Sequence, residues 1–134
     1  MKSLKRETIP IQNSSDVVLA RQKVRQWAQE LRFTLVDQTK LVTAASELAR
    51  NTLDHGKGGH MIIDVVENLA KTGLQLVFED RGPGIPDIQA ALRDGFTTGT
   101  GMGLGLGGSK RLVSDFDIQS QPGQGTRITV VRWK

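Results

Sequence analysis

A carboxylate and an amide stand four residues apart in the segment Glu47-Leu-Ala-Arg-Asn51. In a helix this spacing places Glu47 and Asn51 on one face, at the edge of an apolar stripe that includes Leu48. Mg²⁺ prefers oxygen ligands and keeps waters and substrate phosphates, so Asn51 is a candidate magnesium ligand and Glu47 a candidate general base. The spacing alone favours the plainer interpretation, in which both side chains lie on a solvated helix edge.

A second acidic residue follows a row of alternating apolar residues, Leu74, Leu76 and Phe78. Because side chains alternate along a strand, Asp80 lies on the same buried face and needs a hydrogen-bond partner. It could cap its own Asp-x-Gly turn, as such turns often do. It could also accept a hydrogen bond from the exocyclic amine of a nucleobase, with Gly82 and Gly84 letting the backbone approach the ring.

Glycine forms six of the ten residues from Gly99 to Gly108, just before a predicted helix. Free N–H groups next to a helix N-terminus favour phosphate, although a glycine hinge is the plainer alternative. No Gly-Lys-Ser/Thr is present, so the segment is not a P-loop. Residues 103–108 match G-x-G-x-x-G, but no strand directly precedes them and no acid lies about twenty residues further on, so a Rossmann site is disfavoured.

The turn Gly123-Gln-Gly-Thr126 joins two predicted strands, and the Thr126 hydroxyl could face a ligand. His55 and His60 flank another glycine-rich loop. They lack a third ligand at suitable spacing, so a metal site there is disfavoured.

These residues require a scaffold, and the apolar periodicity predicts one. We expect one domain over residues 1–134, of the α+β class: a two-layer α/β sandwich with a mixed, mostly antiparallel sheet and helices on one face. Ser14, Ser15 or Asp16 should cap the first helix, Thr34 the second, and Gly56 should end the second in a left-handed conformation. The predicted strands are 6–12 (an edge strand containing Pro10), 60–68, 73–80, 116–121 and 126–133, and the predicted helices are 14–32, 34–56, 87–94 and 109–115.

The composition excludes several classes of protein. The 134 residues contain no cysteine and carry a formal charge of +4. The polar start, Met1 to Glu7, predicts no signal peptide or membrane span, and hence a cytoplasmic protein. The cations are dispersed, Tyr is absent and aromatics are few, so nucleic acid is disfavoured, and an acidic protein partner or a nucleotide is favoured.

Taken in order, these motifs resemble the boxes of the GHKL ATPase superfamily, which includes gyrases, histidine kinases and MutL. Glu47-x-x-x-Asn51 resembles the N box, Asp80-x-Gly82-x-Gly84 the G1 box, Gly101-Met-Gly103-Leu-Gly105 the G2 box and Gly125-Thr126 the G3 box. The resemblance implies a Bergerat-type sandwich that binds ATP and Mg²⁺ under a lid. It implies ATP contacts from Asn51, Asp80, Gly82, Gly84, Ile85, Thr98, Gly99, Gly101, Met102, Gly103, Leu104, Gly105 and Thr126.

Within that superfamily the chain is similar to the small serine kinases of partner-switching systems, of the stressosome switch type. The segments Val18–Arg21, Ser46–Asn51, Glu79–Asp87, Asp94–Thr97 and Lys110-Arg111 carry this similarity. It implies phosphorylation of STAS-domain proteins and activation of a PP2C-type phosphatase by the released kinase.

The related anti-sigma kinases have a longer, charged lid, whereas no charged residue lies between Phe96 and Ser109 here. This difference disfavours an anti-sigma factor and removes a candidate arginine for the γ-phosphate, a role that Lys110 or Arg111 could take. A non-catalytic, nucleotide-gated binding module stays an alternative, although Glu47 favours the kinase. The catalytic domain of a histidine kinase is disfavoured, because no His-bearing helix precedes residue 14.

Overall fold

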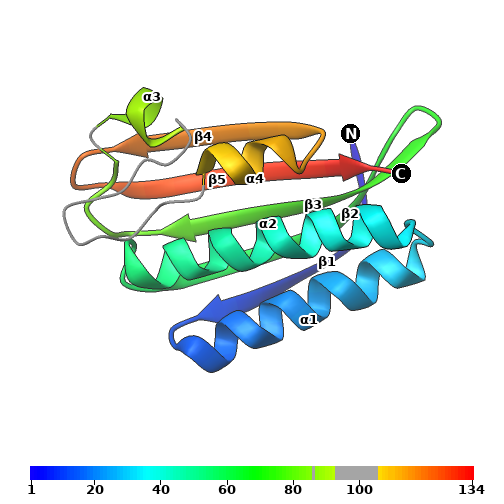
Figure 1. The fold of residues 1–134 in the computed structure, drawn as a ribbon, viewed down its shortest axis with the longest axis horizontal. Coiled ribbons are helices and arrows are strands. Elements are labelled where there is room, and N and C mark those ends of the chain that lie inside the picture. The colour runs from blue at the N-terminus through cyan, green and yellow to red at the C-terminus, as the bar shows by residue number, and fades with distance from the viewer. Residues whose placement is uncertain (86, 93–105) are drawn as a thin grey trace.

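The computed structural model describes residues 1–85, 87–92 and 106–134. Its elements follow the chain in an order of one strand, two long helices, a hairpin, two short helices and a second hairpin (Figure 1). They are β1 (Lys2–Ile11), α1 (Ser14–Glu30), α2 (Leu35–Asp54), β2 (Gly59–Asn68), β3 (Lys71–Asp80), α3 (Ile88–Ala91), α4 (Leu106–Arg111), β4 (Asp115–Gln121) and β5 (Gly125–Trp133).

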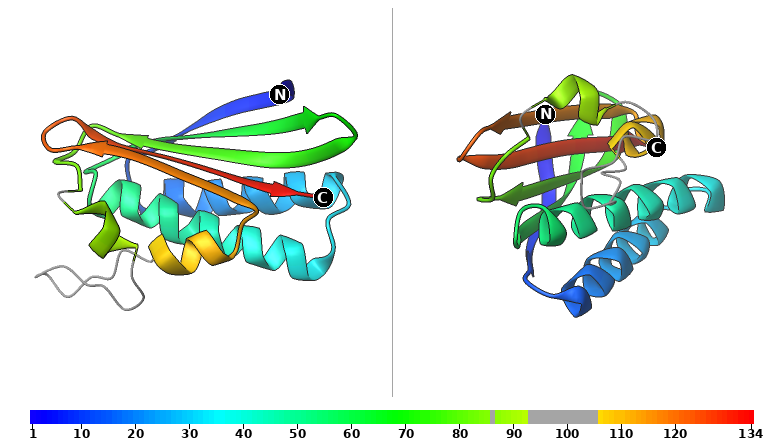
Figure 2. Two further views of the ribbon diagram at one scale, coloured as in Figure 1. Left: turned by 90° about the horizontal axis from the view of Figure 1, so that it is seen from above. Right: turned by 60° about the vertical axis from the view of Figure 1, so that its left-hand side comes forward.

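The five strands form one sheet in the order β1-β2-β3-β5-β4. Every pairing between described strands is antiparallel, so the parallel part of the expected mixed sheet does not occur among these residues. Figure 2 shows the helices on one face of the sheet and no helix on the other, which we call the open face. The predicted α+β class and two-layer sandwich are therefore confirmed, with β1 at an edge as Pro10 required.

The core lies between the sheet and the helices α1 and α2. Helix α1 buries Val17, Ala20, Val24 and Trp27, and the predicted row Leu74, Leu76 and Phe78 of β3 points toward the helices. Burying a side chain of this size stabilises the fold by about 1.5–3 kcal/mol. Among the described residues no helix is long and apolar enough to cross a membrane.

Several predicted helix ends are confirmed and others are wrong. Thr34 caps α2 by accepting from the Asp37 N–H at 3.1 Å, as predicted. Helix α1 is capped by Asn13, whose side chain accepts from the Asp16 N–H at 3.0 Å, while the Asp16 carboxylate accepts from the Gln12 N–H. Gly56 does not adopt the predicted left-handed conformation, which occurs instead at Lys57 with a φ of 59°.

The helix predicted at 109–115 is displaced. It spans Leu106–Arg111, and Asp115 already belongs to β4. Leu106 and Ser109 are each only 1% exposed, and this tertiary packing outweighs the poor helix propensity of Gly107 and Gly108. Helix α3 is capped by Asp87, whose side chain accepts from the Ala90 N–H at 3.0 Å, but the end of the predicted helix 87–94 lies outside the described residues.

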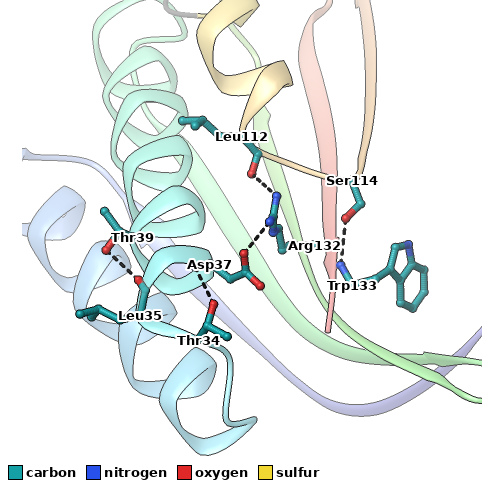
Figure 3. A network of polar contacts seen from close by, with 8 residues as sticks. All are labelled: Thr34, Leu35, Asp37, Thr39, Leu112, Ser114, Arg132 and Trp133. Carbon is teal, nitrogen blue, oxygen red and sulfur yellow. Dashed lines mark hydrogen bonds and ion pairs between the residues drawn. The ribbon is translucent and has the colours of Figure 1, made fainter.

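A polar network fastens the N-terminal end of α2 to the C-terminal end of β5 (Figure 3). Arg132 Nη2 donates to Asp37 Oδ1 at 2.6 Å, and Nη1 donates to the Leu112 carbonyl at 3.1 Å. Ser114 Oγ accepts from the Trp133 N–H close by. Arg132 thereby joins α2, β5 and the link between α4 and β4.

Candidate nucleotide site

A pocket lies between the C-terminal half of α2, the C-terminal end of β3 and the N-terminal end of β5. Five predicted site residues meet there, Asn51, Asp80, Gly84, Ile85 and Thr126. Apolar walls complete it, from Leu48, Phe78, Leu106 and Ile128. Its accessible volume is about 30 Å³, and a site needs about 10–15 Å³ for each water. A planar base therefore enters only if the walls move apart.

Asp80 lies at the end of β3, where one oxygen of its carboxylate is already engaged. Oδ1 accepts from the Gly82 N–H at 2.9 Å, so the Asp80 side chain does cap its own turn. Burial raises the pKa of the Asp80 carboxyl, although the Gly82 and Thr126 N–H groups and the nearby His55 act to lower it. The turn-capping and base-reading interpretations are therefore compatible, because a carboxylate has further lone pairs.

Gly56 allows the end of α2 to approach Asp80. A Cβ atom on Gly56 would overlap the Cβ and Cγ atoms of Asp80, and one on Gly82 would lie 2.7 Å from Gly56 Cα. The sequence predicts only a left-handed cap at Gly56 and misses its close approach to Asp80 beside the pocket. Its position just after the Asn51 helix, facing a predicted Asp-x-Gly turn, was the available signal.

Gly84 lines the pocket, where the sequence predicts a close approach of main chain to a ring, and it has a packing role as well. A Cβ atom there would overlap the carbonyl of Gln121, so the glycine allows close packing of the chain against itself. The φ of Gly84 is 80°, a conformation that favours glycine in any case.

Ser120, which sequence reasoning missed, organises the polar side of the pocket. Its hydroxyl accepts from the Ile85 N–H at 2.7 Å and donates to the Gly125 carbonyl at 3.1 Å. The Thr126 hydroxyl lies 2.9 Å from the same oxygen. Because Ser120 has one proton, Thr126 donates to it and keeps lone pairs that can accept from a ligand.

Comparisons with known proteins bear on what this pocket holds. Residues 36–134 match the family described as histidine kinase-, DNA gyrase B-, and HSP90-like ATPase. The chain belongs to this ATPase family. The match includes the elements that line the pocket, which are α2 from residue 36 onward, β3, α4 and β5.

Individual relatives agree with the family. The chain is 45% identical, over 93% of its length and 94% of the relative's, to the serine/threonine-protein kinase RsbT of Bacillus subtilis. It is 26% identical, over 92% of its length and 89% of the relative's, to an anti-sigma F factor of Thermoanaerobacter. The resemblance to a GHKL kinase of the RsbT type is confirmed.

The fold recurs in solved structures. One of them contains the RsbU and RsbW domains of Rv1364c from Mycobacterium tuberculosis, with a TM-score of 0.63 and 18% identity. The match covers 98% of this chain and 33% of that chain.

Glu47 lies one turn before Asn51 on α2 of this ATPase domain. Its side chain is exposed and does not line the pocket, whereas Asn51 is half-buried and does. The two residues therefore share a helix edge as predicted, and Asn51 lines the pocket whereas the Glu47 carboxylate is accessible to another molecule.

Part of the predicted site cannot be placed. Thr98, Gly99, Gly101, Met102, Gly103, Leu104 and Gly105 lie outside the described residues. Leu106, the first described residue after them, lines the pocket. Lys110 and Arg111 are exposed in the last turn of α4 and do not line it.

The described residues include no group of three or more His, Cys, Asp or Glu side chains that could hold a metal. A dedicated protein cage is thus absent from this part of the chain. The Asn51 amide in the pocket nevertheless fits Mg²⁺, which commonly takes one or two protein oxygens and completes its shell with phosphates and water.

Proposed function

We propose that this chain is an ATP-dependent protein serine/threonine kinase of a partner-switching system. The main supporting observation is that Asn51 and Asp80, from different elements, line one pocket while Glu47 stays accessible on the same helix. The 45% identity to a serine/threonine kinase supports the same conclusion.

In this proposal the pocket reads adenine. Ionised Asp80 accepts a hydrogen bond from the exocyclic amine, and Thr126 contributes its free lone pairs. Guanine has a carbonyl oxygen where adenine has this amine, so an acceptor-only side chain rejects it. Apolar Leu48, Phe78 and Ile128 enclose the ring.

Asn51 would hold Mg²⁺ near the phosphates, and bound Mg²⁺ would offset their negative charge. The N–H groups of Gly101, Gly103 and Gly105 would bind the phosphates, and Lys110 or Arg111 could add positive charge. Glu47 would accept the proton of the substrate hydroxyl. The hydroxyl oxygen of the substrate then forms a bond to the γ-phosphorus of ATP. The bond between the γ-phosphorus and the oxygen that bridges it to the β-phosphate breaks, and ADP leaves.

We propose STAS-domain proteins as substrates and a PP2C-type phosphatase as a second partner. The similarity to RsbT supports this choice, since it extends over 93% of the chain. The rival function is that of an anti-sigma factor or other nucleotide-gated binding module, favoured by the 26% identity to an anti-sigma F factor. A pure binder does not need Glu47, so this carboxylate discriminates between the two.

The test is to incubate the chain with labelled ATP, Mg²⁺ and candidate STAS-domain proteins, and then to locate the label. We expect phosphoserine or phosphothreonine on the partner. The Glu47→Ala variant should transfer phosphate about 10²–10⁴ times more slowly. It should bind ATP as tightly as the parent, because Glu47 does not line the pocket. Transfer by Glu47→Ala at the parent rate would exclude the base role, and no transfer by the parent would favour the binding module.

A further inference from the structure

A larger hollow lies on the opposite side of the sheet from the nucleotide pocket. It has a volume of about 510 Å³ and lies among the loop after α2, the start of β2 and the end of β3. A neighbouring hollow of about 280 Å³ extends from it toward the β4–β5 turn. The two share Glu79 and Asp80, and together we call them the open-face hollow.

The strand register shows which side chains face this hollow. His60, Glu79, Arg127 and Gln119 stand opposite one another on β2, β3, β5 and β4. They alternate with Met61, Phe78 and Ile128, which point into the core. The row therefore faces away from the helices, on the side of the sheet that no helix covers in Figure 2.

The charge of the open-face hollow is predominantly positive. Lys57, Arg81 and Arg127 are exposed, and in the described part of the chain none of them has an ion pair. Glu79 is the one carboxylate of the facing row, and its Oε1 lies 3.3 Å from His60 Nε2. The Asp80 carboxylate is bonded to Gly82. Three cations thus face two carboxylates, Glu79 and Asp80, so the hollow carries a net positive formal charge.

Partly exposed main chain at Gly58 and Gly59 contributes to the lining of the hollow. A Cβ atom on Gly59 would overlap the Glu79 carbonyl, and one on Gly58 would lie 2.8 Å from Gln12 Oε1. Between them and α2, Lys57 adopts a φ of 59°, a conformation that costs a non-glycine residue about 1–3 kcal/mol and is common at functional sites. Partly exposed glycine main chain bordered by cations suits an extended peptide with acidic side chains.

We propose that the open-face hollow is a docking site for an extended acidic segment of a protein partner. Gly56, Asp80 and Gly82 border this hollow, and Gly56 and Asp80 also line the nucleotide pocket. A segment bound on one side therefore acts on residues that hold the ligand on the other. Binding at the two sites is coupled, and this coupling rests on the proposed function.

The test uses the full chain, labelled with ¹⁵N, and a synthetic peptide of alternating Glu and Gly. We expect shifts confined to residues 56–60, 79–82 and 119–127. The triple variant Lys57→Glu, Arg81→Glu, Arg127→Glu should bind the peptide roughly tenfold more weakly. A matched triple, Lys2→Glu, Arg25→Glu, Lys71→Glu, carries the same net charge on exposed residues outside the hollow and should bind nearly as well as the parent.

Equal losses of peptide affinity in the two triple variants would overturn the proposal. Chemical-shift changes spread over the whole basic surface would overturn it as well. So would tighter binding of a single-stranded oligonucleotide of the same charge at these residues, or self-association of the free chain through them.

The coupling has its own readout. Saturating ATP with Mg²⁺ should change the peptide affinity by at least about threefold, and the peptide should change the ATP affinity by the same factor. Unchanged affinities would overturn the coupling. Absence of ATP binding in a separate calorimetric titration would instead overturn the proposed function and leave the docking result standing.

Discussion

The two ends of α2 perform different tasks. At the N-terminal end Thr34 caps the helix and Asp37 binds Arg132, which also bonds to the Leu112 carbonyl (Figure 3). At the C-terminal end the helix stops beside a pocket, where Asp80 has a raised pKa and the buried His55 Nε2 lacks a hydrogen-bond partner in the described structure. One end is fastened by side-chain bonds, and the other leaves bonding capacity for a ligand.

The difference between the two ends shows how a small fold tolerates a site with an unpaired buried polar group. An unpaired buried polar group costs about 1–3 kcal/mol. The bonds around Arg132 lie at the far end of the same helix, and they add to the packing of core residues such as Leu48 in holding α2 in place. Even there one atom, Arg132 Nε, is buried without a partner among the described residues. The contrast is therefore one of degree, and it can be tested by substitutions at each end.

The largest effect on the pocket end is expected from Gly56→Ala. The added Cβ overlaps Asp80, which is fixed in β3, so ATP affinity should fall roughly ten- to a hundredfold. Gly108→Ala is the control, because a Cβ atom on Gly108 meets nothing within 4 Å. Calorimetric titration measures both variants. Parent-like affinity in Gly56→Ala would show that the close approach of Gly56 to Asp80 is not needed for binding.

A smaller effect, at the other end, is expected from Arg132→Ala. The variant loses bonds to Asp37 and Leu112, and partial exposure limits the cost to about 1–2 kcal/mol of unfolding free energy. The exposed pair of Glu7 and Lys23 provides the control, Glu7→Gln, with a loss under about 0.5 kcal/mol. Urea unfolding gives both values. If Arg132→Ala instead weakens ATP binding as much as Gly56→Ala, the two ends are not functionally separate.

The smallest effect concerns pH. The Asp80 carboxyl accepts hydrogen bonds without donating any only when it is ionised. The affinity for adenosine should therefore be full above the pKa of this carboxyl and should fall as the pH drops through that pKa. Because burial raises this pKa above its ordinary value of 3.8, the fall begins at a higher pH than for an exposed Asp. Adenosine is the suitable probe, since it has no phosphates that titrate. His55→Gln removes a positive charge that lowers the pKa of Asp80, so the fall should move to higher pH.

An unchanged pH profile in His55→Gln would show that His55 does not act on Asp80. A profile that falls only near the ordinary value in the parent chain would contradict the effect of burial on this carboxyl.

The sequence predicted the features that depend on local pattern. Alternation in β3 placed Leu74, Leu76 and Phe78 inside and aligned Asp80 with them, and the Thr34 cap followed from side-chain chemistry. The sequence was less informative where tertiary contacts determine the local structure. Leu106 is buried and extends α4 across two glycines, against local propensity.

The candidate site also divides into residues that local sequence pattern predicted and residues whose effect depends on tertiary contacts. Asn51, Asp80 and Thr126 were found from spacing and motif order, and they do meet in one pocket. Gly56 and Ser120 were missed, because each acts on a segment distant in sequence. Gly56 makes room for Asp80, and Ser120 accepts from Ile85, 35 residues away.

The most direct test of the account is the nucleotide selectivity of Asp80→Asn, measured by calorimetric titration with ATP and GTP in the presence of Mg²⁺. A charged hydrogen bond of about 1.5–3 kcal/mol predicts a loss of ATP affinity of roughly ten- to a hundredfold. Selectivity against GTP should fall as well, because an asparagine amide can donate to the guanine carbonyl. ATP binding as tight and as selective as that of the parent chain would contradict the assignment of this pocket to adenine.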